Sequence, residues 1–593
     1  MSVIWEAYWK WIKEHVTAVL TGVFVVLLIA SPHIRAWHIV GVTNFEGVHP
    51  AFSDDEVYYQ ARIKEAVEGK WWVGNPYLKE HIHDPFVMPP VAEGLIAGVT
   101  RLTNTSVPFV TSVSDAVFPF IDFLLLYTLF LILTQKNKRV SLFYTASFFC
   151  FFLATFGRPI SPQFNALFLF LGLISITKIY FSEETQNKKR NFIAGMITGI
   201  TCFISPYYFT TLLALYFILI GARIVYEKSA VAIQKNIPWF LMSFIPFAAL
   251  FAFFQLRAAE GSYYGEAVLR FGLMHTHIPG SFTNMVLGIL TLGVLVFALK
   301  TVSPRAYLYC SSLLVSIFVL NWQNVITGKS LQFSSHYSFT TILSVLMVFS
   351  TIHAALMVPT NAHLSRWRKT ATILSIVTVF SLIAYHQKGE FMNIARMPYS
   401  EKELIHEQEK MEVFNWLNEH TPEDSVVYAL GGNYDFLIPI YTKNAVYYNF
   451  YATLYSVSNE ETEERWLIQN LFGPGMSTST LLEKQRDYWG NRFIDSHQSA
   501  QNRKKILTIV SREVYEPSEM IDNKYIDEMY ARWNYVKQKP FNKALSQYEV
   551  DYIILSKEYV HWHEAEKKLK ELKEVTLIAT INGDQIYEFH ETF

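Results

Sequence analysis

The chain has 593 residues, of which 51% are apolar and only 17% are charged. This composition lies outside the range of ordinary soluble domains and indicates a protein embedded in the lipid bilayer. The formal net charge of -1 excludes nucleic acid as a partner, because binding to a phosphate backbone requires a concentrated excess of Lys and Arg. The cysteines, Cys150, Cys202 and Cys310, all lie within apolar runs and show neither a disulfide framework nor a metal-binding spacing.

The first apolar run, VTAVLTGVFVVLLIAS, begins at Val16 and is predicted to be a retained membrane anchor. It has no convincing cleavage site, and many further apolar runs follow it, so a secretory signal peptide is a poorer interpretation. Apolar stretches near the length that crosses the bilayer as a helix predict eleven spans in total. They lie near residues 14–32, 111–134, 140–156, 164–181, 191–205, 208–226, 237–256, 282–301, 305–321, 337–358 and 370–386.

The distribution of Lys and Arg among the short connections predicts the orientation of these spans. Alternate connections are rich in positive charge, as in QKNKR (135–139), QNKKR (186–190) and SRWRK (365–369), and such connections face the cytoplasm. An odd number of spans then places the amino terminus in the cytoplasm and everything after about residue 387 outside. The predicted external segments are 33–110, 157–163, 257–281, 322–336 and the carboxy-terminal part.

The carboxy-terminal part differs sharply in composition from the rest of the chain. Glu, Lys, Asn and Asp become frequent after residue 386, and the apolar runs shorten to strand length. The predicted strands are SVVYAL (425–430), YIIL (552–555), VTLIATI (575–581) and QIYEF (585–589), and helical periodicity occurs at 402–420 and 557–573. The expected fold is therefore a mainly α-helical polytopic membrane domain, 1–386 with its external loop 33–110, followed by an extracytoplasmic α/β domain, 387–593.

Three adjacent acids stand in the first external loop, within the stretch FSDDEVYYQARIKEAVEG that begins at Phe52. The structural interpretation is a capping box, in which Ser53 caps a helix and Glu56 reaches back to the cap amide. A helix start needs only one or two such acids, however. Three carboxylates beside a low-dielectric layer repel one another and raise the proton affinity of at least one of them, as a catalytic base requires.

This pattern resembles the GT-C superfamily of integral-membrane glycosyltransferases. The resemblance rests on the anchor helix, the external loop opening with DDEVYYQAR, the run NPYLKEHIHDPFVMPP, ten further spans and the external carboxy-terminal domain. It implies a polyprenyl-phosphate-linked sugar as donor, and an aspartate at the start of the first external loop that is the catalytic base or binds a metal near it. That role falls on Asp55 or on its neighbour Asp54, with Glu56 as the capping residue and a further candidate for substrate binding.

The chemistry implied by the resemblance requires one base and one cationic clamp. A glycosidase must protonate its leaving group and so uses two carboxyl groups, whereas a lipid phosphate leaves without a proton and only its charge must be balanced. Candidate clamp residues lie at predicted external ends of spans: Arg158, Lys329 with His336, and Arg270. Cations at these places commonly act as interfacial anchors. Irregular or polar surroundings place Arg158 and Lys329 above Arg270 as ligands of the phosphate.

Whether a divalent metal ion takes part is left open by the sequence. The histidine pairs in EHIHD (His81, His83) and MHTHIPG (His275, His277) have a spacing that can ligate a metal from a loop or strand, although such pairs are more often hydrogen-bonded surface residues. Two further acids, Asp115 and Asp122, lie in or near the second predicted span. They are costly in lipid, so they should face a cavity or a partner.

The predicted function is inverting transfer of a sugar from the polyprenyl-phosphate carrier to an extracytoplasmic glycan, lipid or protein, in a prokaryotic plasma (inner) membrane. One alternative is a transporter or flippase of a lipid-linked sugar, but that class predicts inverted repeats with polar groups at the membrane midplane, and the charged residues gather at external helix ends instead. A second alternative is a non-catalytic member of the same fold that binds lipid or glycan, which would keep all of these residues.

Overall fold

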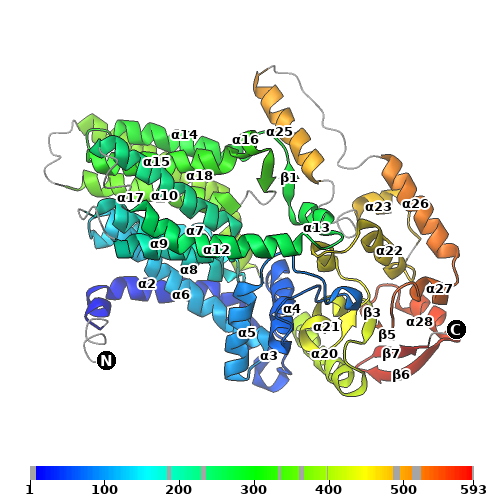
Figure 1. The fold of residues 1–593 in the computed structure, drawn as a ribbon. Coiled ribbons are helices and arrows are strands. Elements are labelled where there is room, and N and C mark those ends of the chain that lie inside the picture. The colour runs from blue at the N-terminus through cyan, green and yellow to red at the C-terminus, as the bar shows by residue number, and fades with distance from the viewer. Residues whose placement is uncertain are drawn as a thin grey trace.

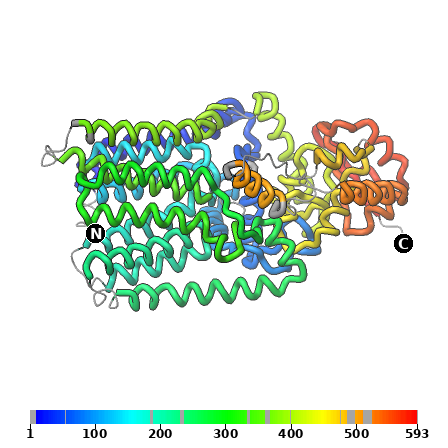
Figure 2. Tube along the Cα trace, turned by 90° about the horizontal axis from the view of Figure 1, so that it is seen from above, coloured from blue at the N-terminus to red at the C-terminus, as the bar shows by residue number. Residues whose placement is uncertain are grey.

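The computed structural model describes residues 9–182, 188–228, 236–331, 336–358, 366–396, 399–473, 475–484, 494–510 and 523–590. Most helices of the first two thirds of the chain run side by side in one bundle, and the strands of the last third form a sheet beyond one end of that bundle (Figure 1). Helix α2 (Val16–Ile29) starts at the other end of the bundle, so its start and the sheet lie far apart (Figures 1 and 2).

Each of the eleven predicted spans coincides with a helix. These helices are α2, α6 (Val107–Leu133), α7 (Lys138–Phe151), α8 (Gln163–Phe181), α9 (Lys188–Thr201), α10 (Pro206–Glu227), α12 (Ile237–Ala258), α14 (Phe282–Phe297), α15 (Pro304–Trp322), α17 (His336–Leu356) and α18 (Arg366–His386). Seven helices in the described part are long and apolar enough to cross a membrane, and α2 with α3 (Ser31–Asn44) forms an eighth candidate bent by 56°. Helices α7, α9 and α14 have only 14, 14 and 16 residues, so the predicted number of eleven spans is not confirmed.

Two glycines allow α9 to pack closely on α12. Gly195 and Gly199 are four residues apart and therefore lie on one face of α9. A Cβ atom on Gly195 would lie 2.2 Å from the carbonyl oxygen of Phe240, and one on Gly199 would lie 2.8 Å from the Cβ of Phe247. Small residues at this spacing bring membrane helices into backbone contact, which is the main source of helix association where no hydrophobic effect operates between helices.

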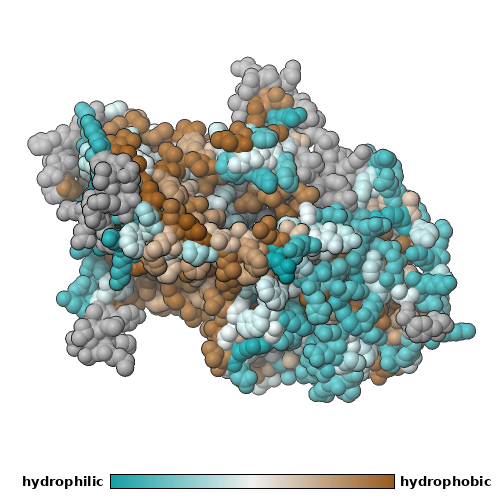
Figure 3. Space-filling model, viewed as in Figure 1, coloured by the Kyte–Doolittle hydropathy of each residue, from teal (hydrophilic) through white to brown (hydrophobic). Residues whose placement is uncertain are grey.

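On the face shown in Figure 3, the surface of the bundle is mainly apolar, whereas the carboxy-terminal part is covered largely by hydrophilic residues. Large apolar side chains such as Phe253 of α12, Ile289 of α14 and Leu374 of α18 are exposed along the bundle. A protein surrounded by water rarely exposes contiguous apolar surface of this extent, and a lipid environment removes that cost. The chain is therefore a multi-pass membrane protein.

The sheet of the carboxy-terminal part has five strands in the order β4-β3-β5-β7-β6. They are β3 (Val426–Leu430), β4 (Ala445–Val446), β5 (Tyr552–Leu555), β6 (Val575–Ile581) and β7 (Asp584–Phe589). Strand β3 pairs in parallel with β4 and β5, and β7 pairs antiparallel with β5 and β6. The central strands β3 and β5 are buried throughout, as expected for uninterrupted apolar strands in parallel pairing, and the predicted α/β fold class is confirmed.

In the sequence, the helices of this part lie before the sheet or between its strands. They are α19 (Lys388–Ala395), α20 (Glu401–His420), α21 (Tyr434–Tyr441), η5 (Phe450–Leu454), α22 (Asn459–Gln469), α23 (Thr478–Glu483), α25 (Ile494–Val510), α26 (Asn523–Gln538), α27 (Phe541–Leu545) and α28 (Trp562–Glu571). The GGN sequence after β3 is a turn in which Gly431, Gly432 and Asn433 all have positive φ angles. This conformation favours glycine and asparagine, and it leads directly into α21.

The first predicted external loop folds into α4 (Asp54–Glu68), η1 (Lys79–His81) and α5 (Val91–Thr103). Helices α4 and α5 lie across the direction of the bundle, at the end nearest the sheet (Figure 1). The loop contacts the carboxy-terminal part directly, because the Val446 amide of β4 donates to the carbonyl oxygen of Tyr77 at 2.8 Å. This hydrogen bond attaches the loop to β4, the strand at one edge of the sheet.

Two other predicted external segments also meet at this end of the bundle. The segment after α12 contains α13 (Tyr264–Phe271) and β1 (Leu273–His275), and the segment after α15 contains α16 (Asn324–Thr327) and β2 (Lys329–Leu331). Strands β1 and β2 pair antiparallel, with His275 opposite Lys329. The predicted external segments are therefore gathered at one end of the molecule, and the side of the membrane that this end faces stays a prediction.

The predicted sidedness is tested by cysteine labelling at His590, one residue after β7. Because the Lys and Arg bias places this residue outside, His590→Cys should react with a membrane-impermeant maleimide in intact cells or spheroplasts. The same substitution in a background lacking the three native cysteines is the control for specificity. Labelling only after permeabilisation would reverse the predicted topology.

A charged contact between η1 and α22 predicts a loss of stability in alkaline solution. His81 Nδ1 lies 2.6 Å from Asp84 Oδ2, and His81 Nε2 lies 3.0 Å from Glu461 Oε2. Burial acts to lower the pKa of His81, but the two carboxylates raise it to about 9. A raised histidine pKa stabilises the fold fully below the unfolded value of about 6.5, and this contribution disappears as the pH rises through about 9.

The melting temperature of the detergent-solubilised protein should therefore fall between pH 6.5 and 9.5, and His81→Gln should flatten this part of the profile. The contribution is at most about 3 kcal/mol, from the size of the pKa shift. Equal slopes for the variant and the wild type would show that His81 does not carry the effect.

Candidate active site

The acids of the first external loop form the start of α4, and Glu56 is its capping residue. Glu56 Oε2 accepts from the Phe52 amide at 2.8 Å, and Glu56 Oε1 accepts from Gln60 Nε2 at 3.3 Å. The predicted capping box is only half formed, because the Ser53 side chain makes no cap hydrogen bond with the described residues. Burial raises the pKa of Glu56 to about 7, while the nearby His33 acts in the opposite direction.

Asp55, the residue before Glu56, forms an ion pair with Arg158. The contact joins Asp55 Oδ2 to Arg158 Nη2, between residues that are 103 positions apart in the sequence. Both groups remain accessible, since 40% of the Asp55 side chain and 27% of the Arg158 side chain are exposed. The candidate base therefore lies with Arg158, one of the two clamp residues ranked above Arg270. The side chain of the alternative base, Asp54, lies outside the described part of the structure.

The loop that carries Arg158 is held by two residues that follow the last bundle helix, α18. This loop contains η2 (Thr155–Gly157). Both the amide and the hydroxyl of Thr155 donate to the carboxylate of Glu390 in α19, at 2.8 and 2.7 Å. The side chain of Gln387 adds a bond to the carbonyl oxygen of Phe151 at 3.1 Å. The backbone next to Arg158 is therefore fixed by residues more than 220 positions further along the chain.

A buried polar network joins α3, α6 and α8 near Glu56. His33 Nε2 lies 2.6 Å from Asp115 Oδ2, and Gln163 Nε2 donates to Asp115 Oδ1 at 2.5 Å. Asp115 thus has the partners that an acid in lipid needs. Asp122, seven residues further along α6, is fully buried and has no hydrogen-bond partner among the described residues.

The predicted clamp residues His336 and Lys329 lie in different surroundings. The ring of His336 lies 4.7 Å from that of Tyr207. His336 is also close enough to Arg158 for the two side chains to interact electrostatically. Lys329 is exposed on β2 and forms no ion pair with the described residues. His336 is thus within electrostatic range of Arg158, whereas nothing in the described contacts brings Lys329 to the Asp55 carboxylate.

Arg270 is occupied by a structural role. Its guanidinium is buried and donates to the carbonyl oxygens of Thr453, Tyr455 and Val457, at 2.5, 3.0 and 2.5 Å. A fourth bond of 2.5 Å reaches Asn459 Oδ1. Because its donors are used to join α13 to the segment before α22, this placement argues against Arg270 as a ligand of a phosphate.

A metal site is not evident in the described part of the structure. There, no three His, Cys, Asp or Glu side chains converge in a way that would hold a metal ion. The histidine pairs have other contacts: His81 is bonded to carboxylates, and His277 Nδ1 lies 3.0 Å from the carbonyl oxygen of Val325. Among the described side chains, the charged contact of Asp55 is with Arg158, and a carboxylate paired with an arginine does not by itself provide the ligands of a divalent cation.

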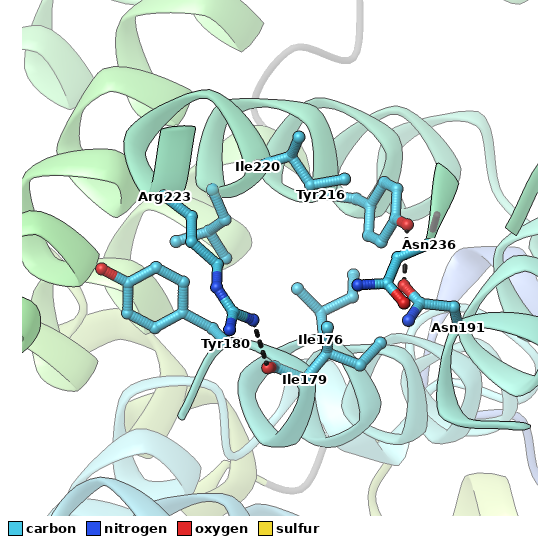
Figure 4. A pocket seen from close by; sticks show the side chains of 9 residues that line it. Ile176, Ile179, Tyr180, Asn191, Tyr216, Ile220, Arg223 and Asn236 are labelled. Atoms are coloured by element: carbon cyan, nitrogen blue, oxygen red, sulfur yellow. Dashed lines mark hydrogen bonds between the residues drawn. The ribbon is translucent and has the colours of Figure 1, made fainter. Parts of the chain in front are cut away.

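A pocket lies at the far end of the bundle from Asp55, between α8, α9, α10 and α12 (Figure 4). It is lined by Ile176, Ile179, Tyr180, Asn191, Tyr216, Leu219, Ile220, Arg223 and Asn236. Arg223, its one charged lining residue, is 2.5 Å from Glu227 and donates to the carbonyl oxygen of Ile179 at 3.3 Å. The cation of this pocket is already balanced by Glu227, and among the described residues its lining includes no carboxylate that could act as a base.

Sequence reasoning missed the residues that hold the candidate site in place. His33 bonds to Asp115, and Glu390 holds the loop of Arg158. Each is a polar residue at the end of an apolar run, a position that signals contact with another element at the membrane boundary. Their partners lie 82 and 235 positions away, so no local pattern reveals them.

Comparison with known proteins supports the fold but not a close relationship. No protein-family profile and no characterised protein matches the sequence. The structure is similar to the arabinofuranosyltransferase AftD from mycobacteria, with a TM-score of 0.52 and 9% identity over 98% of this chain. This chain spans 40% of the length of AftD.

Two further solved structures show a lower similarity. ArnT from Cupriavidus metallidurans bound to undecaprenyl phosphate has a TM-score of 0.43 and 10% identity, over 95% of this chain and 98% of ArnT. The Archaeoglobus fulgidus oligosaccharyltransferase has a TM-score of 0.40 and 11% identity, over 74% of this chain and 66% of that one. The likeness to AftD extends over 98% of the present chain. The chain therefore has the GT-C fold that its sequence pattern predicted.

Proposed function

We propose that the protein is an inverting glycosyltransferase that transfers a sugar from a polyprenyl-phosphate carrier to an extracytoplasmic glycan, lipid or protein. The observation that carries this proposal is the ion pair between Asp55 and Arg158. It joins an accessible carboxylate to an accessible arginine, at the end of the bundle where the predicted external segments gather. These two groups are the base and the cationic clamp that transfer from a lipid phosphate requires.

In the proposed reaction, Asp55 takes the proton from a hydroxyl group of the acceptor. The acceptor oxygen then attacks the anomeric carbon of the sugar from the side opposite the phosphate, which inverts the configuration. The bond between that carbon and the phosphate oxygen breaks, and the polyprenyl phosphate leaves with the electron pair. Arg158 balances the negative charge that develops on the leaving phosphate, with His336 nearby. No acid is needed, because a phosphate leaves without a proton.

Two further carboxylates, those of Glu56 and Glu390, have supporting roles in this proposal. Glu56 holds the first turn of α4, and Glu390 holds the loop of Arg158. Together they set the distance between base and clamp, and correct placement of reacting groups contributes a large part of enzymatic rate enhancement. The protein is expected in the plasma membrane, with its amino terminus in the cytoplasm and the proposed site outside.

The proposal is tested by incubating the purified protein with polyprenyl-phosphate pentoses and hexoses in the presence of cell-envelope extract. Free polyprenyl phosphate is the common product for every sugar and acceptor, so its release is the measurement. Release by the wild type, and much less by Arg158→Gln, is expected. Release that is equal for the variant and the wild type would remove Arg158 from the mechanism, and no release with any sugar would contradict the proposed donor class.

A further inference from the structure

The two groups that the proposed reaction needs are bonded to each other in the structure. Arg158 Nη2 contacts Asp55 Oδ2 directly. A base must have its carboxylate free to receive a proton, and a clamp must have its guanidinium free to receive a phosphate. Neither group can act fully while the ion pair persists.

The ion pair can be displaced by a suitable ligand. Both side chains are partly exposed, at 40% and 27%, and exposed ion pairs contribute little to stability. The phosphate of a polyprenyl-phosphate sugar is a diester with one negative charge, like a carboxylate, and its two free oxygens can accept two parallel bonds from one guanidinium. A lipid phosphate at this site therefore competes with Asp55 for Arg158 and can hold the guanidinium by two parallel bonds.

The exchange is confined to the two side chains, because both backbones are held. Glu56 bonds to the Phe52 amide at the start of α4. Glu390 bonds to the amide and hydroxyl of Thr155, three residues before Arg158. With these anchors in place, the carboxylate and the guanidinium can separate by side-chain rotation alone.

We propose that the Asp55–Arg158 ion pair masks the site until a lipid phosphate takes Arg158 and releases Asp55. This inference rests on the proposed function and adds an order of binding to it: the donor binds before the acceptor is activated. A carboxylate that loses its cationic neighbour holds a proton more tightly and is a stronger base. Binding of the donor thereby activates Asp55 as a base. Without a donor, the Asp55 carboxylate remains paired with Arg158.

The test measures binding of undecaprenyl phosphate to the purified full-length protein in detergent. Asp55→Asn removes the competing carboxylate and keeps a residue that is tolerated at a helix start. It should bind the lipid phosphate more tightly than the wild type, by up to about fivefold, the range expected for loss of an exposed ion pair. Asp55→Ser should behave in the same way, and it provides a second variant if Asp55→Asn folds poorly. Arg158→Gln should bind at least about tenfold more weakly, since charged hydrogen bonds are lost.

Two controls isolate the competition. Glu227→Gln makes the equivalent carboxylate-to-amide change beside Arg223, at the far end of the bundle, and should not alter binding. Undecaprenol, which lacks the phosphate, should bind the wild type and the Asp55 variants equally. Equal or weaker binding of undecaprenyl phosphate by folded Asp55 variants, or tighter binding of undecaprenol as well, would overturn the mask. Failure of every variant and of the wild type to bind the lipid phosphate would overturn the mask and also contradict the donor class in the proposed function.

Discussion

Asp55→Asn is expected to lose at least about a hundredfold in sugar transfer while the protein still folds and binds the donor. General bases typically contribute about 10²- to 10⁴-fold to the rate, and an amide cannot take a proton from the acceptor hydroxyl. Asparagine is nearly as good as aspartate at the start of a helix, so α4 should persist. The measurement is release of polyprenyl phosphate by equal amounts of variant and wild-type protein that elute identically in gel filtration.

The neighbouring acids provide matched comparisons for this result. Glu56→Gln makes the same chemical change one residue further along and keeps an acceptor for the Phe52 amide, so its loss should be far smaller. Asp54→Asn decides between the two aspartates, because the Asp54 side chain lies outside the described part of the structure and only activity can compare it with Asp55. Wild-type transfer by both aspartate variants would mean that the three acids only start a helix. Inactivity of Asp54→Asn alone would move the base by one residue.

Glu93→Gln is expected to destabilise the protein by about 3–5 kcal/mol, the usual cost of leaving a buried charge without its partner. Arg62 Nε lies 2.6 Å from Glu93 Oε1, and both side chains are buried. Arg62 also donates to the carbonyl oxygen of Met88 at 3.1 Å and to the hydroxyl of Tyr455 at 3.4 Å. The pair thus joins α4, which carries Asp55, to α5 and to the carboxy-terminal part. Thermal unfolding in detergent is the measurement.

The double variant Arg62→Met with Glu93→Leu is the control for this prediction. Replacing both members of a buried ion pair by apolar residues of similar volume is often neutral, because neither charge then has to be desolvated. The double variant should therefore recover most of the melting temperature that Glu93→Gln loses. A melting temperature of Glu93→Gln equal to that of the wild type would show that the ion pair contributes nothing to stability.

Several elements of the fold could be predicted from local sequence alone. Every predicted span is a helix, and the predicted strands at 425–430, 552–555, 575–581 and 585–589 correspond to β3, β5, β6 and β7. These predictions succeeded because apolar length and alternation reflect how a segment is buried. The number of crossing spans was less predictable: α7 and α9 end after 14 residues, and only packing on neighbouring helices decides where a short apolar helix lies.

The candidate site was predicted residue by residue, and the tertiary structure separated its members. Asp55 and Arg158 form an ion pair. Arg270 instead donates its hydrogen bonds to carbonyl oxygens of the segment at 453–457, and Lys329 is exposed on β2. All three cations stand at comparable places at the ends of apolar runs. Their sequence surroundings therefore looked equivalent, and the difference arises only from which distant chain segment packs against each of them.

By itself, the sequence determined that the chain is a multi-pass helical membrane protein with an α/β carboxy-terminal part. Local composition and the spacing of apolar residues along the chain are enough to indicate which segments are buried and as what element. It also determined that an acidic helix start follows the first span, because capping depends on neighbouring residues. Only the tertiary structure decided that Asp55 faces Arg158, that His33 meets Asp115 and that Glu390 holds the loop of Arg158. These are contacts between side chains 82 to 235 positions apart, and ion pairs and hydrogen bonds act over a few ångströms, so they exist only once the helices have packed.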